Sequence, residues 1–320
     1  MRPSARVGLR TRLGSIVKAT AIIVLLAGTV VPATADTPPK IPTEAYLKGA
    51  PIDYPIPAAP DNNSDTGMLD LYLVRTAQRD ASPATRTEAF DDASAYFFDD
   101  LLPRFSEAAG SETPLTALNK PILAHMLEYV LNDAMYYSSD AKYQRPRTRP
   151  FAEGSPKDAK GNPVLDANNQ PIRTEIGACF TFKLGWADAY PSGHSANGYS
   201  TALLLAEIYD GRRAQLLARG ARYGDNRVVC GVHHPSDVER GRAIARAMFA
   251  KLLDNQAFKD DLACAREEAS KTPAAYSPVC AKKYITYRDE MVARATGKLC
   301  ATYKDDAIKP AICPAKPATK

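Results

Sequence analysis

The spacing of apolar residues constrains the fold of this chain more than any other feature of its sequence. From residue 115 to residue 134 the apolar positions follow one another at intervals of three and four: Leu115, Leu118, Ile122, Met126, Val130 and Ala134. This spacing gathers them on one face of a helix that runs towards Ala141. The alternation that marks strands is almost absent from the chain. The sequence therefore predicts an all-α protein that folds as a compact helical bundle.

Residues that start and stop helices divide the rest of the chain. Helical spacing recurs in four more segments, which are 68–79, 87–102, 202–209 and 213–222. The second of these is expected to end at Pro103, because proline cannot continue a helix. A long helix is expected to begin at Pro235, since proline suits the first helical position. Residues 272–320 are expected to combine loops with short helical pieces.

The first 35 residues are typical of a secretory signal peptide. A basic start is followed by the apolar run 21–31 and by an A-x-A cleavage site at 33–35. We expect cleavage before Asp36 and a periplasmic or secreted protein without a stable membrane anchor, because the apolar run is short for a membrane span. The basic residues of this leader are Arg2, Arg6, Arg10, Arg12 and Lys18.

These five residues account for the whole formal charge of +5. Without them, the basic residues equal the 36 acidic residues in number, so the mature chain is close to neutral. The charge therefore gives no reason to expect nucleic acid as a partner. The six cysteines all follow the leader, at positions 179, 230, 264, 280, 300 and 313. An even number in an exported chain favours disulfides, and their spacing matches no zinc motif.

The stretch YPSGHS at 190–195 predicts an anion site. A turn of Pro191, Ser192 and Gly193 precedes a helical pattern, which leaves unpaired backbone N–H groups and a hydroxyl at the positive end of a helix. His194 would stand within reach of an anion bound there. The stretch alone is weak evidence, so its meaning depends on the segments around it.

Two other segments carry groups that suit an anion. Residues 142–151 (KYQRPRTRPF) contain Lys142 and Arg149, although such a charged stretch taken alone is typical of a solvated loop. Further on, His233 and Asp237 lie four apart at the start of a predicted helix. A carboxylate bonded to Nδ1–H of the imidazole would leave Nε2 as a nucleophilic lone pair. An ordinary helical i,i+4 pair explains this spacing equally well.

Together these segments resemble the tripartite signature of the type 2 phosphatidic acid phosphatase superfamily: Lys142-x6-Arg149-Pro150, Pro191-Ser192-Gly193-His194 and Arg227-x5-His233-x3-Asp237. Within it, the leader, the lack of membrane spans and the phrase RVVCG at 227–231 make the chain similar to the bacterial class A non-specific acid phosphatases. The resemblance covers about 58–268. Asn226 stands where that family usually has serine, and His234 stands where it often has tryptophan. His234 could contact the substrate at the rim of the site, but we expect it to be a helix-start residue.

The resemblance implies a role for each matched residue. The phosphate oxygens would be held by five of them: Lys142, Arg149, Ser192, Gly193 and Arg227. His233 would be the nucleophile that forms a phosphohistidine, His194 the general acid and base, and Asp237 the residue that orients His233. The implied reaction is hydrolysis of phosphate monoesters at acidic pH, with phosphotransfer to an alcohol as a related activity. Phosphate or vanadate would be ligands of the site, and no metal or other cofactor is expected.

The chain is expected to have four parts. From the residues themselves, 1–35 would be the signal peptide, 36–65 an extended arm and 271–320 a disulfide-tied extension. The resemblance implies that 66–270 is a single phosphatase domain of the phosphatidic acid phosphatase type 2 and haloperoxidase fold. The segment 153–177 is expected to be a polar excursion with a short hairpin. Cys230 lies inside the third motif and Cys179 just before the second, so we expect these two to pair. The preferred substrate and homo-oligomerisation are left open.

Three other functions use the same residues. A vanadium-dependent haloperoxidase would hold vanadate where phosphate sits, but such proteins are generally longer than this chain. A lipid phosphatase is disfavoured because the mature chain lacks hydrophobic spans. A non-catalytic phosphate-binding protein would have no need of paired histidines. Hydrolysis of a phosphate monoester distinguishes the last of these from an enzyme.

Overall fold

The structure, a computed structural model, describes residues 38–153 and 187–302, together with 156, 158–160, 162, 164, 179, 184 and 185 between them; side chains are described as far as 294. The expected signal peptide (1–35) and the greater part of the 153–177 excursion lie outside these residues. The expected arm, 36–65, is described from residue 38.

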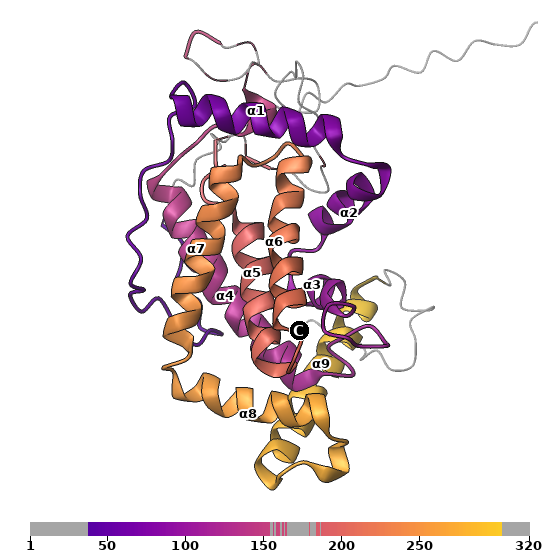
Figure 1. Cartoon of the computed structure of the whole chain (residues 1–320). Helices are drawn as coiled ribbons and strands as arrows, with labels where there is room; N and C mark the ends of the chain where they lie inside the picture. The colour runs from indigo at the N-terminus through magenta and orange to yellow at the C-terminus, as the bar shows by residue number, and fades with distance from the viewer. Residues whose placement is uncertain are drawn as a thin grey trace, which may run out of the picture. The chain divides into compact units, whose positions relative to one another are not determined.

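The described residues fold into α-helices, which confirms the all-α prediction (Figure 1). Among the described residues, two extended segments pair through an isolated β-bridge between Arg147 and Asp188. The helices are α1 (Asp65–Asp80), α2 (Pro83–Ser94), α3 (Phe98–Leu101), α4 (Pro121–Gln144), α5 (Gly193–Ile208), α6 (Arg213–Val229), α7 (Pro235–Leu252), α8 (Gln256–Ser270) and α9 (Pro278–Thr302). Short 3₁₀ turns cover Leu102–Phe105, Pro150–Ala152 and Pro273–Ala275.

Helix α5 is the centre of the bundle, with α4, α6 and α7 packed along it (Figure 1). It is apolar or small on all sides and is buried over nearly its whole length, as expected for a core helix. Glycines allow its neighbours to approach closely. A Cβ added to Gly198 would lie 2.2 Å from the ring of Tyr223, and one added to Gly241 of α7 would lie 2.3 Å from the carbonyl oxygen of Ser192.

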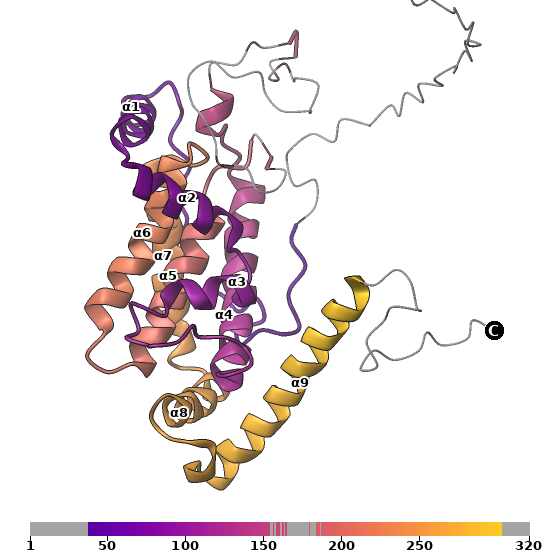
Figure 2. The ribbon, with the colours of Figure 1, turned by 90° about the vertical axis from the view of Figure 1, so that its right-hand side faces the viewer.

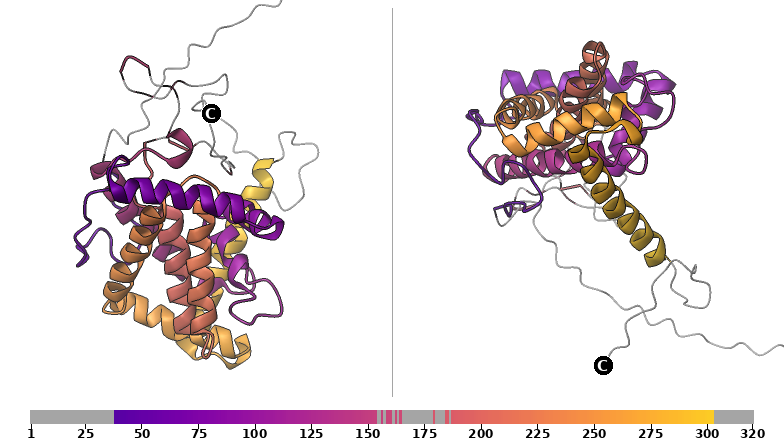
Figure 3. Two further views of the ribbon diagram at one scale, coloured as in Figure 1. Left: turned by 45° about the horizontal axis from the view of Figure 1, so that its top comes forward. Right: turned by 90° about the horizontal axis from the view of Figure 1, so that it is seen from below.

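One end of the bundle gathers four helix ends beside α1 (Figures 1 and 3). Helices α4 and α6 finish there, whereas α5 and α7 start there. Helix ends have backbone groups that the helix itself leaves unpaired, so this end is suited to bind a charged ligand. The residues of the predicted signature all lie at this end, because they belong to these helix ends and to the segments next to them.

The helix expected over 87–102 is interrupted. Helix α2 ends at Ser94, and α3 begins only at Phe98. At this break, core side chains donate hydrogen bonds to backbone carbonyls. The Tyr223 hydroxyl donates to the carbonyl of Ala95, and the side-chain amide of Asn197 donates to the carbonyl of Tyr96 over 3.2 Å. These tertiary bonds replace helical ones, so local spacing could not reveal the break.

The segment before α1 has no helix or strand in its described part, and it is tied to the core. Tyr46 and Leu47 are buried, and their N–H groups each donate to the carboxylate of Asp133 over 3.0 Å. The Tyr46 hydroxyl donates to Asp261 of α8 over 2.8 Å.

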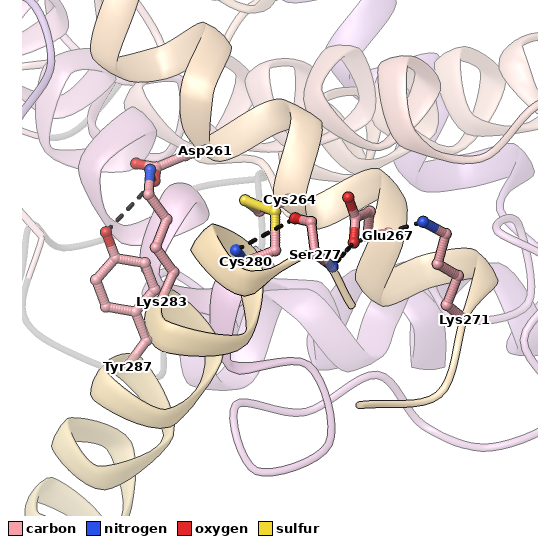
Figure 4. The surroundings of a disulfide bond; sticks show 8 residues. All are labelled: Asp261, Cys264, Glu267, Lys271, Ser277, Cys280, Lys283 and Tyr287. Atoms are coloured by element: carbon pink, nitrogen blue, oxygen red, sulfur yellow. Dashed lines mark hydrogen bonds and ion pairs between the residues drawn. A yellow bond between two sulfur atoms is a disulfide. The ribbon is translucent and has the colours of Figure 1, made fainter. Parts of the chain in front are cut away.

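The C-terminal extension is more helical than the sequence predicts. Helix α9 is 25 residues long and leaves α8 at an angle (Figure 2). A disulfide between Cys264 of α8 and Cys280 of α9 ties the two helices, and Lys283 adds an ion pair to Asp261 (Figure 4). The expected disulfide between Cys179 and Cys230 is also present, whereas the side chains of Cys300 and Cys313 lie outside the described part. No described helix is both long and apolar enough to span a membrane.

Candidate active site

Backbone hydrogen bonds join the three segments of the predicted signature. The N–H of Arg147 donates to the carbonyl of Ala187 over 2.8 Å, and the N–H of Ala189 donates to that of Arg147 over 3.0 Å. This pairing holds the segment after α4 against the one before α5. The N–H of Ser192 then donates to the carbonyl of Asp237 over 2.9 Å, which joins the starts of α5 and α7. Segments distant in the sequence therefore face one another.

The start of α5 has the geometry that its sequence predicts. Ser192 is the N-cap, and its Oγ accepts from the N–H of Ser195 over 3.3 Å. A hydroxyl can accept and donate at once, so the capping bond leaves its hydrogen available to an anion. Gly193 is the first helical residue, and a Cβ added to it would lie 2.9 Å from the hydroxyl of Tyr96. Only glycine leaves room here beside the Tyr96 hydroxyl.

Lys142 and Arg149 lie side by side. Lys142 is in the last turn of α4, and its ammonium donates to the backbone carbonyl of Asp188. Burial lowers the pKa of this lysine to about 8. Arg149 is 3% exposed, and it donates from Nη1 to the carbonyl of Val232 over 2.7 Å and from Nε to the carboxylate of Asp188 over 2.9 Å. The solvated loop that the charge of 142–151 alone favours is not formed.

Arg227 lies in the last turn of α6 and is 1% exposed. In the described part of the chain, its Nε and Nη1 have no hydrogen-bond acceptor. Burial lowers its pKa to about 10, which still leaves it charged at neutral and acidic pH. A buried charge with unmet donors is unfavourable unless an anion accepts from it. Arg227 is therefore the clearest mark of an anion site in this structure.

His233 directs Nε2 towards these cations. Its Nε2 lies 3.0 Å from Nη1 of Arg149. Because a guanidinium can only donate, Nε2 must be the acceptor, and the proton of the neutral ring is on Nδ1. Burial, reinforced by the charge of Arg149, lowers the pKa of His233 well below its ordinary value. The ring is thus a neutral imidazole with its lone pair on the nitrogen that faces the cations.

His194, the second residue of α5, is also buried. Its Nε2 makes a long contact of 3.4 Å with the carbonyl of Ala93, and its ring centroid lies 4.6 Å from that of Tyr96. Burial, followed by the charges of Arg227 and His233, lowers the pKa of His194 well below its ordinary value. With this set of neighbours the ring is neutral.

Asp237 is shared among several donors. Its Oδ1 accepts from Arg147 over 2.6 Å, and its Oδ2 accepts from the N–H of His234 over 2.8 Å and lies 3.1 Å from the Nδ1 of that residue. Nδ1 of His233 is 3.6 Å from Oδ2, which is longer than a hydrogen bond. Burial would raise the pKa of Asp237, but the two imidazoles and Arg147 hold it well below its ordinary value. Asp237 is therefore ionised.

Four residues of this neighbourhood carry no signal in the sequence pattern: Tyr96, Arg147, Glu153 and Asp188. Arg147 is one of several arginines in a charged stretch, and Glu153 opens a polar one. The acidic partners that bury Arg147 are supplied by α1 and α7. His234 is the N-cap of α7, which confirms its prediction as a helix-start residue. Within the described ranges, no group of three or more His, Cys, Asp or Glu side chains is arranged to hold a metal ion.

Known proteins resemble this chain over the same region. The family model described as "PAP2 superfamily" matches residues 127–257. An acid phosphatase of Zymomonas mobilis is 33% identical over 179 residues, which is 56% of this chain and 61% of that protein. Non-specific acid phosphatases of Providencia stuartii and Salmonella typhimurium are 33% and 36% identical, over 52% and 51% of this chain and 60% and 58% of theirs.

This chain therefore spans about three fifths of the length of the curated relatives that it matches. The matched region runs from the middle of α4 to the first residues of α8, and it includes every residue of the predicted signature. The comparisons therefore support the predicted resemblance to the phosphatidic acid phosphatase type 2 superfamily and to bacterial non-specific acid phosphatases. Over residues 127–257 this chain is similar to the PAP2 superfamily.

Proposed function

We propose that this protein is an exported acid phosphatase that hydrolyses a broad range of phosphate monoesters through a phosphohistidine intermediate. The carrying observation is the buried, charged Arg227, whose Nε and Nη1 donors have no acceptor in the described part of the chain. Lys142, Arg149 and the start of α5 lie at the same end of the bundle. Such a group of donors suits a phosphoryl group, whose charge spreads over three oxygens in the transition state. The names of the relatives support the same activity.

The reaction follows from the two histidines. In the first step Nε2 of His233 attacks phosphorus, and the N–P bond forms as the bond from phosphorus to the ester oxygen breaks. His194 gives its proton to the departing oxygen. In the second step His194 takes a proton from water, the water oxygen attacks phosphorus, and the N–P bond breaks to release phosphate. An alcohol in place of water gives phosphotransfer.

The charge of His194 links this reaction to acidic pH. Arg227 contributes to the low pKa of this residue. A bound phosphate monoester offsets that positive charge, so the substrate helps His194 to take up the proton that it donates. Low pH acts in the same direction. We assign these steps to a domain at 66–270, and we propose that 1–35 is a signal peptide, 36–65 an arm and 271–320 an extension.

The test is substitution of the nucleophile. His233→Ala should release no phosphate from p-nitrophenyl phosphate, and rapid quenching of phosphorus-32 substrate in alkaline detergent should trap no phosphoenzyme that is stable in alkali and labile in acid. Wild-type protein should give both. His125→Gln is the control, since His125 is also buried but lies near the start of α4, at the opposite end of that helix from Lys142, where it stacks on Tyr287 of α9. Normal turnover by His233→Ala would refute the mechanism, and bromide oxidation by vanadate-loaded wild type without hydrolysis would refute the function.

A further inference from the structure

His234 lies between two carboxylates. Its ring is fully buried, with Nδ1 3.1 Å from Oδ2 of Asp237 and Nε2 2.5 Å from Oε1 of Glu153. A neutral imidazole has one N–H and one lone pair, so it can donate to only one of two carboxylates. With both ring nitrogens facing a carboxylate oxygen, the ring must carry a second proton or share one with Glu153. The geometry is therefore that of a buried imidazolium.

The charges around His234 agree with this assignment. Asp237 approaches it from α7 and Glu153 from the turn after Pro150–Ala152. Arg147 and His233 also lie next to Asp237, and Lys142 of α4 and Tyr190 interact with it electrostatically. Asp70 of α1 lies behind Arg147, which it contacts over 2.9 Å. Burial opposes the charge of His234, but the bonds to Asp237 and Glu153 outweigh it and raise its pKa.

The same arrangement determines the state of Asp237. Arg147 binds one of its oxygens and His234 the other, so two cations flank a carboxylate that is itself fully buried. A carboxylate between two cations keeps its charge to lower pH than one with a single cation. Asp237 must be charged to attract Nδ1–H of His233, which lies 3.6 Å away.

We propose that His234, held in its charged form by Glu153, is a positioning residue that keeps Asp237 ionised at acidic pH and so sets the acidic limit of activity. This inference rests on the proposed function, because it assigns Asp237 to the orientation of the nucleophile. His234 is fully buried, and both of its ring nitrogens face carboxylates rather than His233. Its effect passes through Asp237.

The experiment compares pH profiles. For His234→Gln and for Glu153→Gln, the acidic limb of kcat/KM for p-nitrophenyl phosphate should move towards neutral pH by about 1 unit, because Asp237 loses a neighbouring positive charge. Glu128→Gln is the matched control: the Glu128 side chain is 14% exposed against 13% for Glu153, and it is paired with Arg294 away from the site. Its profile should stay in place. A uniform loss of kcat at every pH in His234→Gln, with the acidic limb unmoved, would overturn the proposal.

A second measurement uses wild-type protein and does not depend on turnover. The chain has four histidines, so nitrogen-15 spectra can resolve each imidazole, with His234 assigned from the His234→Gln variant or by elimination. Both ring nitrogens of His234 should remain protonated at pH 7, where an ordinary histidine is mostly neutral. A neutral His234 at pH 6 would overturn the inference even in an active enzyme. Absence of hydrolysis by wild type with His234 doubly protonated would instead refute the proposed function alone.

Discussion

Nη1 of Arg149 donates a hydrogen bond of 3.0 Å to Nε2 of His233. The lone pair that would attack phosphorus is thus held by a residue that would also bind the phosphate. Arg149 has further acceptors in Val232 and Asp188, whereas Nε and Nη1 of Arg227 have none in the described residues. The two arginines should therefore differ in their effect on the free energy of unfolding, and this difference can be measured.

Replacing Arg227 should stabilise the protein and inactivate it. Arg227→Met removes a buried charge with unmet donors, so the free energy of unfolding in phosphate-free buffer should rise by about 1–3 kcal/mol. Loss of one donor to the phosphoryl group should lower kcat/KM about 100-fold or more. Thermal unfolding with and without phosphate tests both, since the variant should lose the stabilisation that phosphate gives wild type. Arg145→Met, which changes the net charge equally, should keep that stabilisation; a less stable Arg227→Met would contradict the argument.

Oxyanion binding should raise the pKa of His194. Burial and the charges of Arg227 and His233 keep it low, and a bound anion offsets the arginine's charge. We expect a rise of about 1–3 units on addition of vanadate or phosphate, measured by NMR titration of the assigned imidazole. Burial lowers the pKa of His125 to about 4. This pKa should not change on anion binding, because His125 lies near the start of α4 and stacks on Tyr287 of α9. If the pKa of His194 did not change when the anion binds, the proposed role of His194 as a general acid would lose its support.

Stability should fall as the pH rises towards neutrality, in part because of Glu268. Its carboxylate accepts from the N–H groups of Ile122 and Leu123 at the start of α4, yet burial raises its pKa to about 7. The folded protein thus holds this proton more tightly than the unfolded chain, whose carboxyl titrates near 4.5. The contribution of Glu268 to the unfolding free energy is therefore full below pH 4.5 and is lost between about 4.5 and 7.

Glu268→Gln should remove this part of the pH dependence, about 3 kcal/mol, when unfolding is compared at pH 4.5 and pH 8. The exposed Glu112 provides the control, because Glu112→Gln should leave the wild-type dependence intact. If the unfolding free energies of wild type and Glu268→Gln depended on pH in the same way, burial would not raise the pKa of this carboxyl.

The two disulfides should have different functions. Cys264 and Cys280 close a sequence separation of 16 residues, so a Cys264→Ser, Cys280→Ser double variant should destabilise the docking of α9 by about 3 kcal/mol and expose residues 271–302 to limited proteolysis. Its kcat/KM should match wild type, because this pair joins α8 and α9, and α8 lies at the end of the bundle opposite α1 (Figure 1). Replacing Cys179 and Cys230 should lower activity, since Cys230 is inside the third motif. Equal activities for both variants would show that neither bond supports the site.

Local pattern was sufficient to predict the starts of several helices, but not the break between α2 and α3 or the length of α9. The N-cap at Ser192, the helix start at Pro235 and the long amphipathic α4 depend on neighbours in the sequence. The break at Ala95 depends on Tyr223, which lies more than one hundred residues later. The spacing of apolar residues along the sequence cannot predict contacts between residues so far apart in the chain.

The residues that surround Asp237 could not be predicted from the sequence, for the same reason. His233 and Asp237 suggest an ordinary helical pair, but the closest bonds of Asp237 go to His234 and Arg147. Arg147 is buried only because Asp70 from α1 meets it, and Glu153 matters only because the chain returns to His234. Each of these partners is decided by tertiary folding.

Gly241 has the smallest side chain of α7, and it lies where that helix crosses the start of α5. A Cβ there would come within 2.3 Å of the Ser192 carbonyl, whose own N–H is bonded to Asp237. The absence of a side chain at Gly241 therefore allows the start of α5, which carries His194, to pack closely against α7, which follows His233. Any larger residue at 241 would push apart the two segments that carry the histidines of the proposed mechanism, although Gly241 itself has no part in that mechanism.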